Sequence, residues 1–162
     1  MEIYIMKAQP EMVLDKYGNM ILRVAYSYLQ NMSDAEDILQ DTVIKYIKSA
    51  PEFENENHEK AWLITVASNL SKNKIRYNKI READELDEGL VAKKEEDLSF
   101  VWEAVKGLPV TQREVVHLFY QEGYSTRDIA NMLERNESTV RSDLLRARKR
   151  LKQILKEEYD FE

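Results

Sequence analysis

Apolar residues recur at intervals of three and four along most of this 162-residue chain, and this periodicity constrains its fold more than any other feature. Val13, Tyr17, Ile21 and Val24 are one example. Such spacing places side chains on one face of an α-helix. The chain holds only four glycines and three prolines, so few positions break helices. No segment shows the alternation typical of a strand. The sequence therefore predicts an all-α protein.

Helix boundaries follow from capping and turn residues. Ser33 and Glu36 have the spacing of a capping box, which predicts a helix that begins at Ser33. The segment Ala50–Glu59 contains Pro51 and several polar turn residues, which predicts a loop. The predicted helices are Met12–Leu29, Ser33–Lys48, Lys60–Arg81, Ser99–Gly107, Thr111–Glu122, Ser125–Leu133 and Asn136–Leu155.

Charge is distributed in blocks, although the net charge is −6. Residues 59–81 carry six bases and one acid, and residues 135–152 carry seven bases and two acids. Between them, residues 82–98 carry eight acids and two bases with few large apolar residues, as expected of a flexible linker. This layout predicts two small helical domains, 1–81 and 99–162, each with an anion-binding surface.

Several classes of protein are excluded by composition. The chain has no cysteine and only two histidines, His58 and His117, far apart in sequence. Thiolate chemistry, iron–sulfur clusters and the usual zinc sites are therefore not expected, and we predict no metal or other cofactor. No apolar run approaches the ~20 residues of a membrane span. Residues 1–10 lack the pattern of a secretory signal. We expect a cytoplasmic protein without membrane insertion.

The last two predicted helices, 125–133 and 136–155, have the spacing of a helix-turn-helix. Val140, Leu144, Ala147 and Leu151 would pack inward. The opposite face would then present side chains to a DNA groove, where arginine can read guanine and leucine can contact a thymine methyl group. These residues are Arg141, Ser142, Leu145 and Arg146, with Arg148, Lys149 and Lys152 placed to hold phosphates. The alternative is a basic, solvated helix of an ordinary bundle.

At this point two groups of residues resemble the extracytoplasmic-function group of bacterial RNA polymerase sigma factors. The resemblance extends over nearly the whole chain. The C-terminal group is Leu108-Pro109, Gln112-Arg113-Glu114-Val115, Tyr124-Ser125, Asp128-Ile129-Ala130, Leu133, Ser138-Thr139-Val140-Arg141-Ser142 and Arg146-Ala147-Arg148. The N-terminal group is Asp34-Ala35-Glu36-Asp37-Ile38-Leu39-Gln40-Asp41, Trp62-Leu63, Ala67, Asn69 and Arg76.

The resemblance implies that Asp37, Gln40 and Asp41 face the clamp of core RNA polymerase. The helical pattern adds Ile44 to this face, and acids around an exposed apolar residue suit a charged protein partner. Two alternatives are a solvated acidic face and a carboxylate metal cluster. The second lacks an accompanying Glu-x-x-His motif.

Family members trap a flipped base of the downstream promoter element in the loop before the third helix. Here the resemblance implies Phe53 and Asn69, because an aromatic ring can stack on a base and an amide can read its edge. Lys72, Lys74 and Arg76 would follow the DNA backbone. Phe53 could instead anchor the loop in the core, and Trp62 is expected in the core.

Two positions depart from the family pattern. Glu134 replaces the glycine of the turn after Leu133, where a left-handed residue would cost ~1–2 kcal/mol. Asp143 replaces the usual basic residue after Ser142, and its carboxylate could repel phosphates or accept a hydrogen bond from cytosine. The preferred upstream sequence is therefore open.

We therefore predict an alternative sigma factor, not itself an enzyme, whose partners are core RNA polymerase, promoter DNA and, by resemblance, an anti-sigma factor. The alternative is a helix-turn-helix regulator that acts on DNA without the polymerase clamp. A helical enzyme is a third class, but the sequence has no cysteine, no paired histidines and no phosphate-binding glycine loop.

Overall fold

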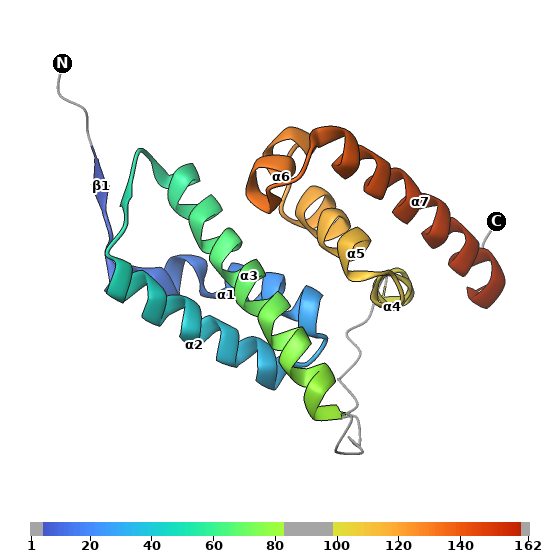
Figure 1. The fold of residues 1–162 in the computed structure, drawn as a ribbon, viewed down its shortest axis with the longest axis horizontal. Helices are drawn as coiled ribbons and strands as arrows, with labels where there is room; N and C mark the ends of the chain where they lie inside the picture. The colour runs from blue at the N-terminus through green and yellow to red at the C-terminus, as the bar shows by residue number, and fades with distance from the viewer. Residues whose placement is uncertain (1–4, 83–98, 160–162) are drawn as a thin grey trace. The chain divides into compact units, whose positions relative to one another are not determined.

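The computed structural model describes residues 5–82 and 99–159, which are almost entirely helical. The chain divides into two compact units, Met1–Leu90 and Val91–Glu162. Both units are visible in Figure 1, where the ribbon runs from blue to green in the first and from yellow to red in the second. The all-α prediction is confirmed. Apart from Glu82, the predicted linker 82–98 lies outside the described residues.

The first unit is a three-helix bundle of α1 (Pro10–Leu29), α2 (Met32–Ser49) and α3 (Glu56–Glu82). Each helix contacts the other two. The apolar face of α1 predicted from the periodicity is buried in the bundle. Burial of this face stabilises the helices far more than their intrinsic propensities do. The buried apolar residues include Val13, Tyr17, Ile21, Val24, Ile38, Tyr46, Leu63, Ile64 and Ala67.

The start of α2 differs from the prediction. Asn31, not Ser33, caps this helix, and its side-chain oxygen accepts a hydrogen bond of 3.0 Å from the backbone N–H of Asp34. Ser33 lies inside the first turn and is exposed. Asparagine is as effective a cap as serine, so either residue satisfied the sequence pattern. The preceding Gln30 is left-handed, with φ of 55°, and this ends α1 before the cap.

The segment between α2 and α3 is more ordered than the predicted loop. Strand β2 (Glu52–Phe53) pairs antiparallel with strand β1 (Met6–Lys7), and Met6 lies opposite Phe53. Helix α3 begins at Glu56, within the range predicted as loop. The periodicity did not indicate these strands, because two residues are too few to show alternation.

The second unit contains α4 (Ser99–Lys106), α5 (Val110–Val116), η1 (His117–Gln121), α6 (Thr126–Leu133) and α7 (Glu137–Tyr159). The sequence predicted one α-helix over Thr111–Glu122, but its second half, η1, is a π-helix. There the backbone N–H of Glu122 donates to the carbonyl of His117, five residues back. The buried apolar residues include Val105, Leu108, Val115, Val116, Leu118, Ile129, Val140, Leu144 and Ala147.

The turn between α6 and α7 has the backbone conformation expected of a helix-turn-helix, and α6 begins at a capping serine. Ser125 caps α6, and its side chain accepts a 3.1 Å hydrogen bond from the N–H of Asp128. Glu134 adopts the left-handed conformation expected for the family glycine, with φ of 54°. Asn136 precedes α7, and its carbonyl accepts from the N–H of Val140 at 3.1 Å. Helix α7 continues to Tyr159, beyond the predicted end at Leu155.

Candidate nucleic-acid and protein interfaces

One side of α2 is exposed and acidic. Asp37, Gln40, Asp41 and Ile44 follow one another at helical spacing, and all are exposed. We call these four residues the acidic α2 face. The buried residues Ala35, Ile38, Thr42 and Tyr46 lie on the other side of the same helix. The structure therefore brings the predicted residues together on one surface.

Ile47 extends this surface by one turn. Its side chain is 52% exposed, against 47% for Ile44. The motif that indicated the acidic α2 face ends before this residue, so sequence reasoning missed it, although its spacing of three from Ile44 was a usable signal. Within residues 5–82 and 99–159, no group of three or more acidic or histidine side chains could hold a metal ion.

Phe53 occupies the core under the α2–α3 connection. Its side chain is only 1% exposed. Its ring stacks on Tyr46 with centroids 6.2 Å apart and meets His58 and Trp62 edge-on at 5.3 and 6.0 Å. Of the two alternatives for Phe53, the structure supports the loop anchor, because these rings cover the surface that a base would need. Trp62 is half-buried in the same cluster.

Three predicted DNA-binding residues share one face of α3. Asn69, Lys72 and Arg76 have a spacing of three and four, and Asn69 and Arg76 are exposed. The Nζ of half-buried Lys72 lies 5.9 Å from the ring centroid of Tyr28. Arg76 donates a 3.0 Å hydrogen bond to the side-chain oxygen of Asn73. Asn73, for which the sequence indicated no role, therefore orients Arg76.

Lys74 does not lie on this face. At 100° per residue it is about 140° around the helix from Asn69. Its Nζ lies 5.3 Å from the ring centroid of Tyr77 instead. The prediction grouped Lys74 with Lys72 and Arg76 by proximity in sequence, which ignores the rotation of the helix. Tyr77 and Ile80 are 56% and 73% exposed near the end of α3, and sequence reasoning missed both.

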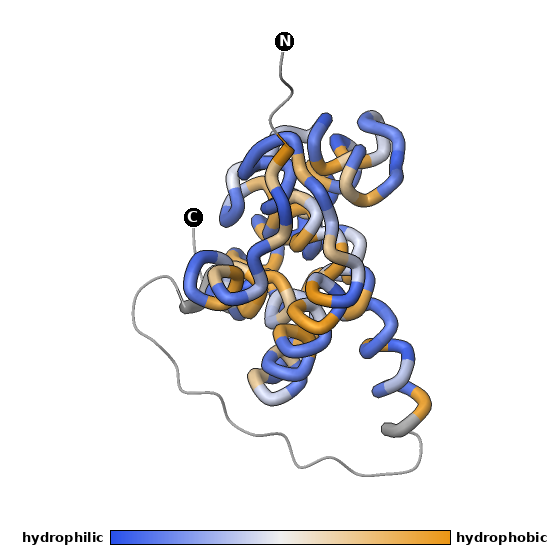
Figure 2. Tube along the Cα trace, turned by 90° about the vertical axis from the view of Figure 1, so that its left-hand side faces the viewer, coloured by the Kyte–Doolittle hydropathy of each residue, from blue (hydrophilic) through white to orange (hydrophobic). Residues whose placement is uncertain are grey.

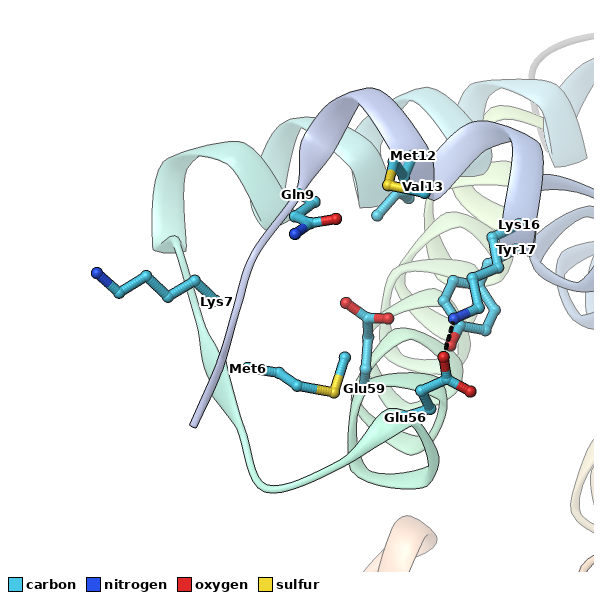
Figure 3. Close-up of a pocket in the computed structure, with 9 residues that line it drawn as sticks. All are labelled: Met6, Lys7, Gln9, Met12, Val13, Lys16, Tyr17, Glu56 and Glu59. Atoms are coloured by element: carbon cyan, nitrogen blue, oxygen red, sulfur yellow. Dashed lines mark hydrogen bonds and ion pairs between the residues drawn. The ribbon is translucent and has the colours of Figure 1, made fainter. Parts of the chain in front are cut away.

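The first unit also contains a pocket of about 210 Å³ beside strand β1 (Figure 3). Its lining residues come from the N-terminal segment and from the first turns of α1 and α3. They are Met6, Lys7, Gln9, Met12, Val13, Lys16, Tyr17, Glu56 and Glu59. Lys16 and Glu56 form an ion pair of 2.5 Å, which Figure 3 shows as a dashed line.

Buried Glu59 lines this pocket and accepts a hydrogen bond from Tyr46. The Tyr46 hydroxyl donates to Oε2 of Glu59 at 2.7 Å and accepts from the backbone N–H of Gln9 at 2.9 Å. Burial, followed by the hydrogen bond to the Glu59 carboxylate, raises the pKa of Tyr46 to about 12. Burial and the nearby Glu59 also raise the pKa of Tyr17. These contacts hold the N-terminal segment, α2 and α3 together.

Helix α7 presents its predicted residues to solvent. Arg141, Leu145, Arg146 and Lys149 are exposed and Ser142 is half-exposed, opposite the buried Val140, Leu144 and Ala147. Leu145 is 52% exposed. Figure 2, which colours the chain trace by residue hydropathy, shows that much of the trace is hydrophilic. We call Arg141, Ser142, Leu145, Arg146 and Lys149 the α7 face.

Arg148 is held at the side of the helix. Its Nε donates a 2.7 Å hydrogen bond to the hydroxyl of Tyr120. Its guanidinium lies 5.8 and 5.7 Å from the ring centroids of Phe119 and Tyr120. Phe119 is only half-buried, and its ring packs against this arginine. A guanidinium stacked in this way keeps donors for a phosphate but has lost freedom of movement.

Asp143 is buried rather than facing the DNA groove. Its Oδ2 lies 3.5 Å from Nη1 of Arg135, and its Oδ1 lies 3.4 Å from Nη1 of Arg146. Both carboxylate oxygens are thus engaged by arginines, and the effect of Asp143 on DNA binding, which the sequence leaves open, stays a prediction. Arg135 in turn forms an ion pair with Glu114, whose side chain is fully buried in α5.

Within the described ranges, 5–82 and 99–159, no helix is both long and apolar enough to cross a membrane. The sequence of the first unit matches the model of Sigma-70 region 2 over residues 13–80. The second unit matches Sigma-70 region 4 over residues 101–151. The two matches include all three surfaces described above.

Comparison with individual proteins agrees with these matches. The chain is 30% identical to the ECF RNA polymerase sigma factor SigM of Mycobacterium tuberculosis, over 86% of this chain and 74% of that protein. It is 29% identical to the RNA polymerase sigma factor SigV of Bacillus subtilis, over 84% and 85% of the two chains.

Among solved structures, the sigma factor RpoE of Bartonella quintana, in complex with the anti-sigma factor NepR, matches with a TM-score of 0.72 and 27% identity. The match covers 91% of this chain and 97% of that one. The chain belongs to the extracytoplasmic-function (ECF) group of RNA polymerase sigma factors, which direct core RNA polymerase to promoters for transcription initiation.

Proposed function

We propose that this sigma factor binds core RNA polymerase and the two promoter elements through three separate surfaces. The acidic α2 face binds core RNA polymerase, Asn69, Lys72 and Arg76 on α3 bind the downstream promoter element, and the α7 face binds the upstream element. One observation carries this proposal: each set occupies one solvent-accessible face of one helix. For the downstream-element set this holds after Phe53 and Lys74 are left out.

The acidic α2 face has the composition of a protein-binding surface. Asp37 and Asp41 are exposed beside Ile44, which is itself 47% exposed. An apolar centre with charges at its edge supplies both burial and electrostatic selection for a basic partner. We assign this surface to the polymerase clamp.

The α7 face is suited to double-stranded DNA. Its arginines can form paired hydrogen bonds with guanine, and exposed Leu145 can contact a thymine methyl group. Asn69, Lys72 and Arg76 on α3 combine an amide that can read a base edge with two cations for the backbone of a single strand. The two DNA surfaces therefore suit different forms of the promoter.

The protein would act without catalysis of its own and in the bacterial cytoplasm, where polymerase and DNA meet. Its net charge of −6 opposes non-specific attraction to DNA. We expect weak promoter binding by the protein alone and specific binding by its complex with core polymerase. Tight promoter binding by the isolated chain at physiological salt would contradict this expectation.

We also propose an anti-sigma factor as a regulatory partner. Support comes from the structure of the similar Bartonella quintana sigma factor, which contains such a partner. Affinity capture of the tagged chain from its native cells should recover a protein other than polymerase subunits. Recovery of polymerase subunits alone would count against this partner.

Runoff transcription with the host's core polymerase and a library of promoter fragments tests the main proposal. Start sites that depend on the added protein are the expected result. Absence of such transcripts, together with footprints of the protein alone, would favour the alternative of a helix-turn-helix regulator that bypasses the clamp.

A charge reversal separates these two functions further. Asp37→Lys with Asp41→Lys should abolish binding to core polymerase, while a regulator would keep its DNA binding. Asp15→Lys with Glu11→Lys is a matched control, because both acids are exposed but lie on α1. Equal loss of core binding in the control would show that net charge, not the acidic α2 face, governs the interaction.

A further inference from the structure

A continuous row of alternating charges links the buried side of α5 to the exposed surface of α7. Glu114 on α5 pairs with Arg135 in the helix-turn-helix turn. Arg135 lies 3.5 Å from Asp143, and Asp143 lies 3.4 Å from Arg146. We call Glu114, Arg135, Asp143 and Arg146 the ionic row. It contains two acids and two bases, so it is neutral as a whole.

Within the ionic row, the side chain of Glu114 is the least exposed and that of Arg146 the most exposed. The side chain of Glu114 is 0% exposed, that of Arg135 is 20%, that of Asp143 is 13% and that of Arg146 is 65%. Arg135 Nη1 also approaches the carbonyl of Thr111 at 3.4 Å. The row is therefore fixed at its inner end by buried Glu114 and is most accessible to solvent at Arg146.

We propose that Asp143 is a positioning residue that orients the Arg146 guanidinium to read one base pair of the upstream promoter element. This inference rests on the proposed binding of that element by the α7 face. Nη1 of Arg146 is paired with Asp143, while the Arg146 side chain as a whole remains 65% exposed. A guanidinium whose direction is fixed discriminates between bases, whereas a mobile one gains affinity mainly from phosphates.

The carboxylate also has an electrostatic effect of opposite sign. Because Asp143 neutralises part of the charge of Arg146, it weakens non-specific attraction to the DNA backbone. Removal of this charge should therefore lower sequence preference and raise non-specific affinity together. A purely structural residue would give a different result, since loss of folding lowers both.

The isosteric variant Asp143→Asn tests the proposal in the full chain bound to core polymerase. The readouts are transcription from a library randomised in the upstream element and affinity for non-specific DNA. We expect preference at one base pair to fall about tenfold, as for the loss of one good arginine–guanine contact, with other positions unchanged. Non-specific affinity should rise. Unchanged preference, or a uniform loss at all positions with a lower unfolding temperature, would overturn the proposal.

Two further variants sharpen this test. Arg146→Ala should lose the preference at the same base pair, and adding Asp143→Asn to it should cause no further loss, because coupled residues are not additive. Glu157→Gln removes the same charge from an exposed position near the end of α7 and should leave base preference unchanged. A further loss in the double variant would show that Asp143 acts independently of Arg146.

Failure of the proposed function gives a separate result. In that case the wild-type chain produces no transcripts with core polymerase. Selection of DNA fragments by the full chain alone at low salt then compares the wild type with Asp143→Asn. A loss of preference at one base pair would support the ionic row even so, and identical preferences would overturn it.

Discussion

The hydroxyl of Tyr46 donates a hydrogen bond of 2.7 Å to Oε2 of Glu59, and so joins α2 to the first turn of α3. The same hydroxyl accepts from the backbone of Gln9. Tyr46 is fully buried and Glu59 is 6% exposed. One phenol therefore holds three segments together, and it does so only while it keeps its proton.

We expect Tyr46 to make the stability of the first unit depend on alkaline pH. Its pKa is about 12 in the folded protein, against an ordinary value of 10.0. Above pH 10 the unfolded chain loses this proton before the folded chain does, so the stabilisation present below pH 10 is lost progressively up to about pH 12. At about 1.4 kcal/mol per pKa unit, a shift of two units corresponds to a loss of roughly 3 kcal/mol.

Urea unfolding of the wild type and of Tyr46→Phe over this pH range checks the prediction. The variant should be less stable at neutral pH and should fall less steeply with rising pH. Tyr77→Phe is a suitable control, because Tyr77 is 56% exposed. Parallel pH profiles for the wild type and Tyr46→Phe would contradict the assignment.

Phe53→Ala should destabilise the first unit by about 3–5 kcal/mol, the usual cost of truncating a buried phenylalanine. Denaturant unfolding measures this change. Ile80→Ala, at a side chain that is 73% exposed, should change the stability by less than about 0.5 kcal/mol. A Phe53→Ala protein of undiminished stability would revive the base-stacking alternative.

Arg76→Ala should weaken binding of the downstream element, whereas Lys74→Ala should have little effect. The two substitutions remove the same charge from neighbouring positions, but only Arg76 shares a face with Asn69 and Lys72. Binding of the complex with core polymerase to a promoter fragment with a single-stranded downstream element measures both. Equal losses would show that overall charge, rather than the face of α3, determines affinity.

Glu134→Gly should stabilise the second unit by about 1 kcal/mol. Glu134 has a φ of 54°, and glycine adopts this left-handed region without the steric cost that a side chain incurs. Asn131→Gly is the opposite control, because Asn131 is exposed within α6 and glycine there should lower stability. Thermal unfolding should show a higher unfolding temperature for Glu134→Gly and a lower one for Asn131→Gly. A lower unfolding temperature for Glu134→Gly would contradict the proposed backbone strain at Glu134.

Periodicity predicted most of this fold because each helix has one apolar side and few internal breakers. It could not predict strands of two residues or the choice of Asn31 over Ser33 as a cap, since both residues satisfy the same local rule. The π-helical turn also lacks a sequence signal, because its apolar residues still fit an α-helical spacing.

The candidate surfaces were predictable where spacing alone decides exposure, as for Asp37, Asp41 and Arg141. Spacing alone left the outcome open where a partner from another element covers the side chain. Phe53 is covered by Tyr46 and Trp62 from two other segments, and Asp143 is covered by Arg135 from the turn. Such contacts depend on the tertiary structure and leave no pattern along the chain.

The π-helix η1 contains one residue more than an α-helical turn would need to close the same hydrogen bonds. In evolutionary terms it has the form of a single-residue insertion that the helix absorbed without breaking. Deleting one residue from 117–121 would restore α-helical bonding and rotate the preceding residues by about 100° relative to those that follow. Tyr120 could then no longer meet both Phe119 and Arg148 as it does here. The extra residue thus sets the rotational phase between α5 and the helices α6 and α7, and a change of chain length at this point would reorient α7 relative to α5.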